Sequence, residues 1–117
     1  MHYIDGTVLA VPKENKAIYI KHALEAANIF KEHGAIGLVD CWGDDVPEGE
    51  VTSFPLAVKL KEDEVVCFSW ITWPSKAVRN EGMQKAMEDP RLAPDVNPFP
   101  FDGERMIYGG FNVIVDE

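Results

Sequence analysis

The stretch VVCFSWITW, residues 65–73, decides the fold because it is a strand with apolar side chains on both faces. It is rich in β-branched and aromatic residues, and Pro74 ends it. Strand alternation puts Val66, Phe68 and Trp70 on one face and Cys67, Ile71 and Trp73 on the other. The sheet that contains this strand must therefore be covered on both faces.

A helix is predicted directly after this strand. Ser75 is a typical N-cap residue, and the helix runs to about Glu88, where Pro90 prevents its continuation. The passage 91–105 is rich in proline and is expected to be irregular. Residues 106–115, MIYGGFNVIV, predict the last strand.

Toward the N-terminus the pattern predicts a strand, a helix and a second strand. The strands cover residues 3–12 and 36–43. Between them Asn15 is expected to cap a helix that runs to His33 and stops at Gly34. The passage 44–64 contains prolines and a glycine that exclude one continuous element, and its conformation stays open.

The resulting order, β-α-β-β-α-β, predicts an α+β fold of the ferredoxin-like type. In that fold a four-stranded antiparallel sheet carries both helices on one face. The length of 117 residues fits a single domain, 1–117. The open face of such a sheet would be largely apolar here, which is typical of an interface. We therefore expect a homodimer in which two sheets pack face to face and form an α/β barrel.

Candidate site residues are expected on this open face, because polar groups are costly to bury beneath a helix. Alternation places Tyr3 and Asp5 together in the first strand, and Asp40 and Trp42 together in the second. The expected pocket is lined by Tyr3, Asp5, Asp40, Trp42, Trp70 and Tyr108. Arg105 precedes the last strand and is expected to neutralise one of the carboxylates from the rim.

Charge and composition exclude several partners. The chain has 11 basic and 20 acidic residues, a net charge of −9, which disfavours binding to nucleic acid. No apolar run approaches the roughly 20 residues needed to cross a bilayer. The N-terminal residues lack the pattern of a signal peptide, so we expect a cytoplasmic protein.

The acidic stretch DCWGDD, residues 40–45, resembles a metal site but lacks the required spacing. Counted from Asp44, the positions that a calcium loop needs are occupied by Val46 and Pro55. Cys41 and Cys67 have no spacing typical of zinc and are expected to be reduced. We predict an acidic turn, no metal site and no cofactor.

Three motifs together resemble a known family. They are CWGDDVP beginning at Cys41, SWITWPSKAVR beginning at Ser69, and PFDGERMIYGGF beginning at Pro100. The chain resembles the YbaA-like family of bacteria, domain of unknown function 1428, over nearly its whole length. The resemblance implies the dimeric α/β-barrel superfamily, whose fold serves both enzymes and ligand-binding domains, so the fold alone implies no function.

Two functions of different class stay open. The first is a homodimer that binds a small apolar or aromatic metabolite in a barrel cleft. The second is a cofactor-independent monooxygenase or isomerase, with Asp5, Asp40, Arg105 and Tyr108 as candidate catalytic residues. A closed pocket with convergent polar side chains would favour the enzyme.

Overall fold

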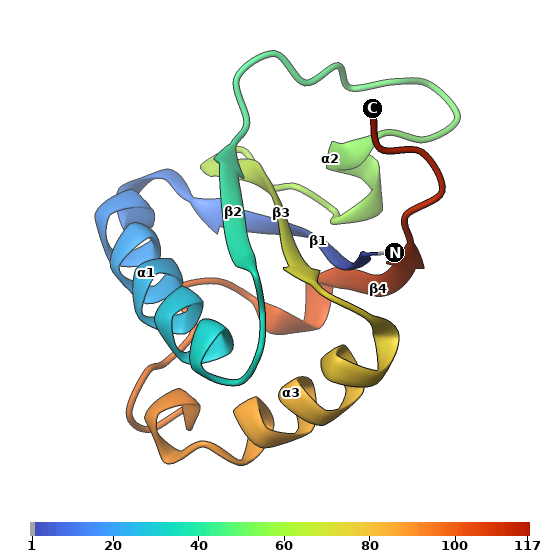
Figure 1. Ribbon diagram of the computed structural model, residues 1–117. Coiled ribbons are helices and arrows are strands. Elements are labelled where there is room, and N and C mark those ends of the chain that lie inside the picture. The colour runs from blue at the N-terminus through green and yellow to red at the C-terminus, as the bar shows by residue number, and fades with distance from the viewer. Residues whose placement is uncertain (1) are drawn as a thin grey trace.

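The computed structural model describes residues 2–117, which form an α+β fold (Figure 1). In chain order its elements are β1 (Tyr3–Pro12), α1 (Lys16–Glu32), β2 (Gly37–Trp42), α2 (Phe54–Ala57), β3 (Glu64–Trp73), α3 (Lys76–Glu88) and β4 (Ile107–Asn112). The predicted order of long elements is confirmed. Strand β4 is shorter than predicted, because residues 113–117 have no regular structure.

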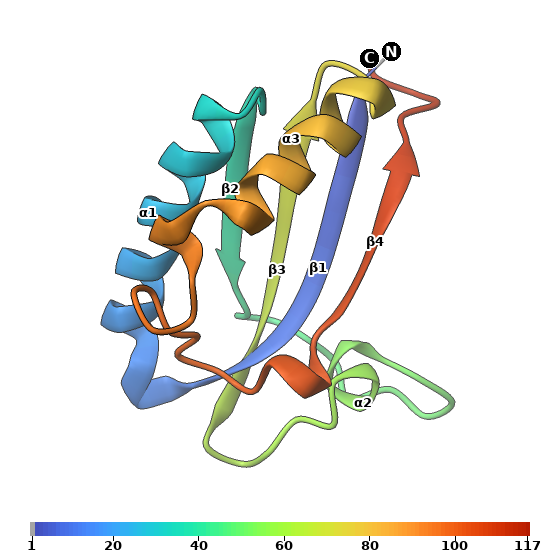
Figure 2. The same ribbon diagram turned by 90° about the horizontal axis from the view of Figure 1, so that it is seen from below.

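The four strands form one antiparallel sheet in the order β2-β3-β1-β4. Helix α1 connects β1 to β2, and α3 connects β3 to β4, so each helix crosses one intervening strand. Figure 2 shows α1 and α3 lying on the same face of the sheet. The other face is referred to below as the open face.

The helix ends follow local sequence signals with one exception. Ser75 caps α3, because its hydroxyl accepts a hydrogen bond from the Val78 backbone N–H at 3.2 Å. Gly34 follows α1 with a φ of 111°, a conformation that favours glycine. The exception is Asn15, whose side chain does not cap α1. Its amide instead donates to the Pro100 carbonyl at 2.9 Å and holds the segment before β4.

Alternation groups the strand residues correctly, but the expected orientation of β1 and β2 is wrong. Tyr3, Asp5, Asp40 and Trp42, which the sequence pattern assigns to the open face, lie on the face covered by helices. The open face instead carries residues such as Ile4 and Val8 of β1.

The physical reason for this difference is that both carboxylates beneath the helices have hydrogen-bond partners. Asp5 accepts hydrogen bonds from Trp73 and Arg79, and Asp40 accepts one from Tyr19. A buried polar group is costly only when it is left without a hydrogen bond. The polarity of a strand residue therefore does not by itself predict which face of the sheet its side chain occupies.

The core between sheet and helices is centred on Trp73, which is fully buried and packs edge-on against Phe30 with ring centroids 6.3 Å apart. Helix α3 approaches this indole at Gly82. A β-carbon built at Gly82 would lie 2.5 Å from Trp73 Cζ3 and would also overlap the His33 carbonyl oxygen. Glycine is therefore required where α3 crosses the end of α1.

The segment between β2 and β3 covers one end of the open face. It contains the short helix α2, which Ser53 caps by accepting from the Leu56 N–H at 3.1 Å. Phe54 of α2 packs edge-on against Phe68 of β3, with ring centroids 6.0 Å apart. At the start of this segment Asp44 and Asp45 are exposed, in agreement with the predicted acidic turn.

Candidate functional site

A cavity of about 460 Å³ lies between the sheet and the two long helices and is called the inner cavity below. Its polar lining consists of Asp5, Thr7, Tyr19, His22, Asp40, Ser69, Arg79 and Tyr108. Its apolar lining consists of Leu9, Ala23, Ala26, Phe30, Leu38, Ile71, Met83, Met87, Phe99, Phe101 and Met106. A mainly apolar wall with a few convergent polar groups is the usual composition of a small-molecule site.

Asp40 and Tyr19 form the most perturbed polar pair in the inner cavity. Asp40 comes from β2, and the Tyr19 hydroxyl of α1 donates a hydrogen bond to Asp40 Oδ1. Burial raises the pKa of Asp40 above its usual range, while the bond from Tyr19 acts in the opposite direction. Burial, together with the neighbouring Asp40, also raises the pKa of Tyr19 well above its usual value.

Asp5 and Arg79 form an ion pair on the other side of the inner cavity. Arg79 of α3 donates from Nη2 to Asp5 Oδ1 at 2.8 Å and from Nε to Oδ2 at 3.0 Å. Trp73 Nε1 donates to Asp5 Oδ2 at 2.9 Å, and the guanidinium of Arg79 lies over the Tyr3 ring. The charge of Arg79 is therefore already neutralised by Asp5 within the structure.

His22 completes the polar set and is held by the segment before β4. Its Nδ1 lies 2.9 Å from Oδ1 of Asn97, with which it forms a hydrogen bond. The His22 ring meets the rings of Phe99 and Phe101 edge-on, with centroids 5.6 and 6.1 Å away.

The structure brings together three of the four candidate catalytic residues. Asp5, Asp40 and Tyr108 all line the inner cavity. Arg105 does not, because its guanidinium binds Glu64 and Asp102 at the start of β3 and in the turn before β4. The expectation that Arg105 neutralises Asp5 or Asp40 is therefore wrong.

The remaining expected pocket residues lie in different places. Trp70 is on the open face, as expected, beside Phe68 with ring centroids 5.7 Å apart. Tyr3 is buried under α3. Trp42 packs against Tyr19, and Lys16 Nζ lies 5.2 Å from the centre of its ring.

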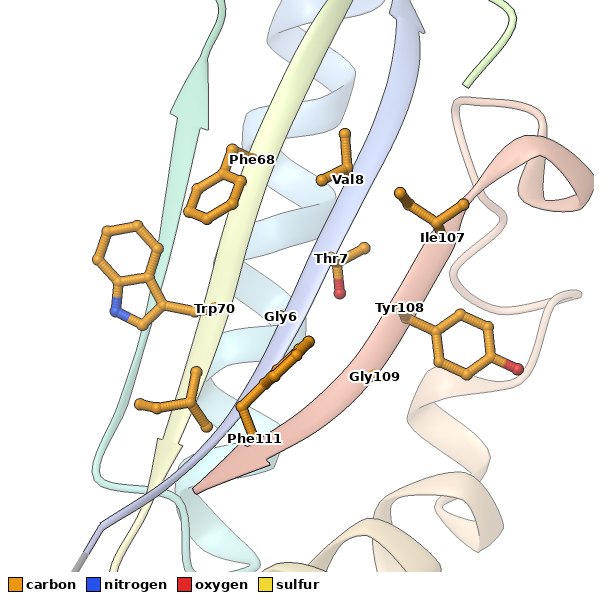
Figure 3. A pocket seen from close by; sticks show the side chains of 10 residues that line it. Gly6, Thr7, Val8, Phe68, Trp70, Ile107, Tyr108, Gly109 and Phe111 are labelled. Atoms are coloured by element: carbon orange, nitrogen blue, oxygen red, sulfur yellow. The ribbon is translucent and has the colours of Figure 1, made fainter. Parts of the chain in front are cut away.

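The open face carries a second hollow, called the outer groove below and shown in Figure 3. Its volume is about 590 Å³, and Gly6 of β1 and Gly109 of β4 face each other in its floor. Side chains of Ile4, Val8, Phe68, Trp70, Ile107 and Phe111 form its walls. Figure 3 shows Tyr108 beside this groove, at the outer edge of β4. The residues that line the outer groove are uncharged and mostly apolar, so a molecule bound there would make mainly apolar contacts.

The cysteines lie on opposite faces of the sheet. Cys41 is exposed on the open face, whereas Cys67 is buried toward the helices, and both are free thiols. Burial raises the pKa of Cys67 to about 12, so this thiol is a poor nucleophile at neutral pH.

Residues 2–117 contain neither a cluster of metal-binding side chains nor a helix able to cross a membrane. No group of three or more His, Cys, Asp or Glu side chains in this part of the chain is close enough together to hold a metal ion. None of its helices combines the length and the apolar composition that crossing a membrane requires.

Sequence reasoning missed Tyr19, His22 and Arg79 as members of the site. Tyr19 and His22 are three residues apart on α1 and so lie on one helical face, a spacing that marks them as neighbours. Their partners Asp40 and Asn97 are 21 and 75 residues away in the chain. No local pattern indicates such pairings.

Comparison with known proteins gives a family without an assigned activity. A family model described as "Protein of unknown function (DUF1428)" matches residues 2–103. A protein named "Uncharacterized protein YbaA" from Escherichia coli strain K12 is 54% identical over 117 residues, which is 100% of both chains. The protein of that name from Shigella flexneri has the same identity and coverage.

Proposed function

Since this chain belongs to the DUF1428 family, described as one of unknown function, we propose from its geometry that it binds a small apolar or aromatic metabolite in the inner cavity. The observation that carries this proposal is the cavity itself. Its volume of about 460 Å³ falls within the range of about 300–1,000 Å³ that is usual for small-molecule sites. The site differs from the expected one, because it lies beneath the helices and not on the open face.

The lining indicates the chemistry of the ligand. Phe30, Phe99 and Phe101 offer aromatic surface, and three methionines offer polarizable side chains that adapt to irregular shapes. Asp40 and His22 are the polar groups that would orient the ligand by hydrogen bonds.

Methyl NMR of methionine tests the binding site directly. The chain has 4 methionines, and Met83, Met87 and Met106 line the inner cavity. We expect indole or benzaldehyde, added as probes, to shift these three methyl resonances together, because a ring in the cavity would contact all three walls. Ala23→Phe should abolish the shifts by filling the cavity, whereas Leu24→Phe, which adds a ring at an exposed position of α1, should leave them intact. Shifts that persist in Ala23→Phe would contradict binding in the inner cavity.

We also propose that the fold is a ferredoxin-like sandwich and that two copies pair through their open faces. The strand order β2-β3-β1-β4, with α1 and α3 on one face, supports the first part. Exposed apolar side chains on the open face support the second, among them Val39, Phe68, Ile107 and Phe111. Contiguous apolar patches of this kind usually mark an interface, and a specific one buries roughly 800 Å² per partner.

A charge placed on the open face should prevent dimerisation. Phe111→Asp is expected to give a monomer, because a carboxylate would be buried without a partner between two sheets. Leu24→Asp is the matched control, since Phe111 and Leu24 are 61% and 62% exposed but Leu24 lies on α1. Sedimentation at micromolar concentration should show a dimer for the wild type and the control. A monomeric wild type would contradict the proposal.

We propose that the protein resides in the cytoplasm and acts without a cofactor. The two free thiols, Cys41 and Cys67, agree with a reducing compartment. The polar groups of the inner cavity can bind and polarise an organic ligand by themselves.

A further inference from the structure

We propose that the inner cavity is a proton-transfer site in which Asp40 removes an acidic C–H proton from an uncharged aromatic substrate. This inference rests on the proposed function, because the substrate must occupy the inner cavity. The natural substrate class is an aromatic carbonyl compound, whose neighbouring C–H bond is acidic. Removing this proton from carbon and returning it to the carbonyl oxygen converts the keto form into its enol isomer and needs no co-reactant.

Asp40 has the position of a general base. Its carboxylate lines the cavity, and the Tyr19 hydroxyl holds Oδ1 by a hydrogen bond, which leaves Oδ2 to accept a proton. Burial raises the pKa of this carboxyl, so its conjugate base is stronger than that of an exposed aspartate. Tyr19 is a positioning residue, because it acts by holding and tuning Asp40.

The walls select an uncharged, aromatic substrate. Phe99 and Phe101 are stacked with ring centroids 5.0 Å apart and present aromatic surface next to His22. A carboxylate substrate would need a free cation, but Asp5 already occupies two donor groups of Arg79. The apolar part of the wall also disfavours the charged form of a carboxylate and so makes it a stronger base.

Titratable groups surround Asp40 on several elements, and the pH dependence belongs to this whole set. They are Tyr19 and His22 on α1, Cys67 on β3 and, elsewhere around the cavity, Asp5 on β1, Arg79 on α3 and Tyr108 on β4. Among them a positive charge on His22 lowers the pKa of Asp40, to a smaller extent than burial raises it.

Nitrobenzisoxazole is a suitable probe, because its conversion requires only a base in an apolar pocket. Asp40 would take the proton of the ring C–H bond. The electron pair of that bond forms the nitrile, the N–O bond breaks, and its electrons leave on the phenolate oxygen. The coloured phenolate is followed by absorbance, and Asp40 returns its proton to water.

Three variants separate the roles of the residues. Asp40→Asn should lower the rate at least tenfold, because the amide cannot accept the proton. Tyr19→Phe should move the midpoint of the rate–pH profile upward, because the bond from Tyr19 lowers the pKa of Asp40. Glu25→Gln, the control at an exposed position of α1 outside the cavity lining, should keep the wild-type rate. A rate that survives Asp40→Asn, or that Glu25→Gln lowers as far as Asp40→Asn does, would overturn the assignment of the base.

The pH dependence offers a second measurement that needs no variant to be active. The wild-type rate should rise with pH through a midpoint above about 3.9, the usual pKa of aspartate. Because the folded pKa of Asp40 is raised, its contribution to stability is fully present below about pH 3.9 and is lost as pH rises through the folded pKa. The wild type should therefore lose stability relative to Asp40→Asn as pH rises. A midpoint at or below 3.9, or the opposite stability trend, would overturn the proposal.

The methionine resonances distinguish this failure from failure of the proposed function. If nitrobenzisoxazole shifts Met83, Met87 and Met106 but is not converted, the cavity binds aromatics and the proton-transfer role is wrong. If it neither shifts them nor reacts, both proposals are wrong. Shifts together with conversion that depends on Asp40 would support both.

Discussion

Replacing Arg105 with methionine is expected to lower the free energy of unfolding by about 3–5 kcal/mol, because it leaves the buried carboxylate of Glu64 without its counter-ion. Arg105 Nη1 donates to Glu64 Oε1 at 2.8 Å and to the Lys59 carbonyl at 2.9 Å, and Nη2 donates to Glu64 Oε2. The pair is nearly inaccessible, with side-chain exposures of 14% for Arg105 and 4% for Glu64. The interactions of Arg105 therefore link the start of β3 to the segments that precede β3 and β4 in the chain.

Lys85→Met is the matched control for this prediction, because Lys85 pairs with Glu81 at 2.9 Å on the exposed surface of α3. An exposed pair of this kind contributes little to stability, because solvent screens the two charges. Chemical denaturation of both variants measures the difference. A loss for Arg105→Met no larger than that for Lys85→Met would contradict a structural role for the buried pair.

The pair of Glu64 and Arg105 should also stabilise the protein against acid. The hydrogen bonds from Arg105 lower the pKa of Glu64 in the folded state. The pH dependence of this contribution to stability is opposite to that of Asp40. The contribution is present above about pH 4.3, the usual pKa of glutamate. It is lost as pH falls through the lower pKa of Glu64 in the folded state. Glu64→Gln should therefore be most destabilising near neutral pH.

Replacing Gly82 with alanine is expected to destabilise the protein by about 1–3 kcal/mol, the usual cost of overpacking a core. In an exposed helix interior the same change would stabilise by about 1 kcal/mol, because alanine has the higher helix propensity. Here the added β-carbon would lie 2.5 Å from Trp73 Cζ3 and would overlap the His33 carbonyl oxygen, so the sign is reversed.

Thermal unfolding is the measurement for Gly82→Ala, with Gln84→Ala as a control at an exposed position of α3. The control should be neutral or slightly stabilising, since it gains helix propensity without a clash. A higher melting temperature for Gly82→Ala would show that α3 can move away from Trp73. Near-ultraviolet circular dichroism would detect such a movement through the environment of the indole.

The sequence by itself determined the α+β class, the order of the long elements and the family. Alternation and turn residues are local signals, and they place β1, β3 and α3 to within a few residues of their observed bounds. The pairing of residues into two faces also follows from alternation, since successive side chains of a strand point to opposite sides. The apolar character of both faces of β3 is likewise visible in the residues themselves.

Only the tertiary structure decided which face of β1 and β2 the helices cover. Alternation is symmetric, so it separates Asp5 from Ile4, and Asp40 from Cys41, without saying which member of each pair lies beneath a helix. That choice depends on partners that come from distant parts of the chain: Arg79 binds Asp5 across 74 positions, and Tyr19 binds Asp40 across 21. Once these partners satisfy the carboxylates, burial no longer carries the cost that polarity suggests.

The inner cavity, like the facing of β1 and β2, is a property of the tertiary structure and not of the local sequence. Its polar residues come from β1, α1, β2, β3, α3 and β4, and its aromatic wall at Phe99 and Phe101 comes from a segment without a periodic pattern. Hydrophobic periodicity indicates which face of an element is buried, but not whether two helices pack tightly or leave a space between them. That spacing is set by the contacts of whole elements, such as the close approach of α3 to Trp73 at Gly82, and it exists only in the folded chain.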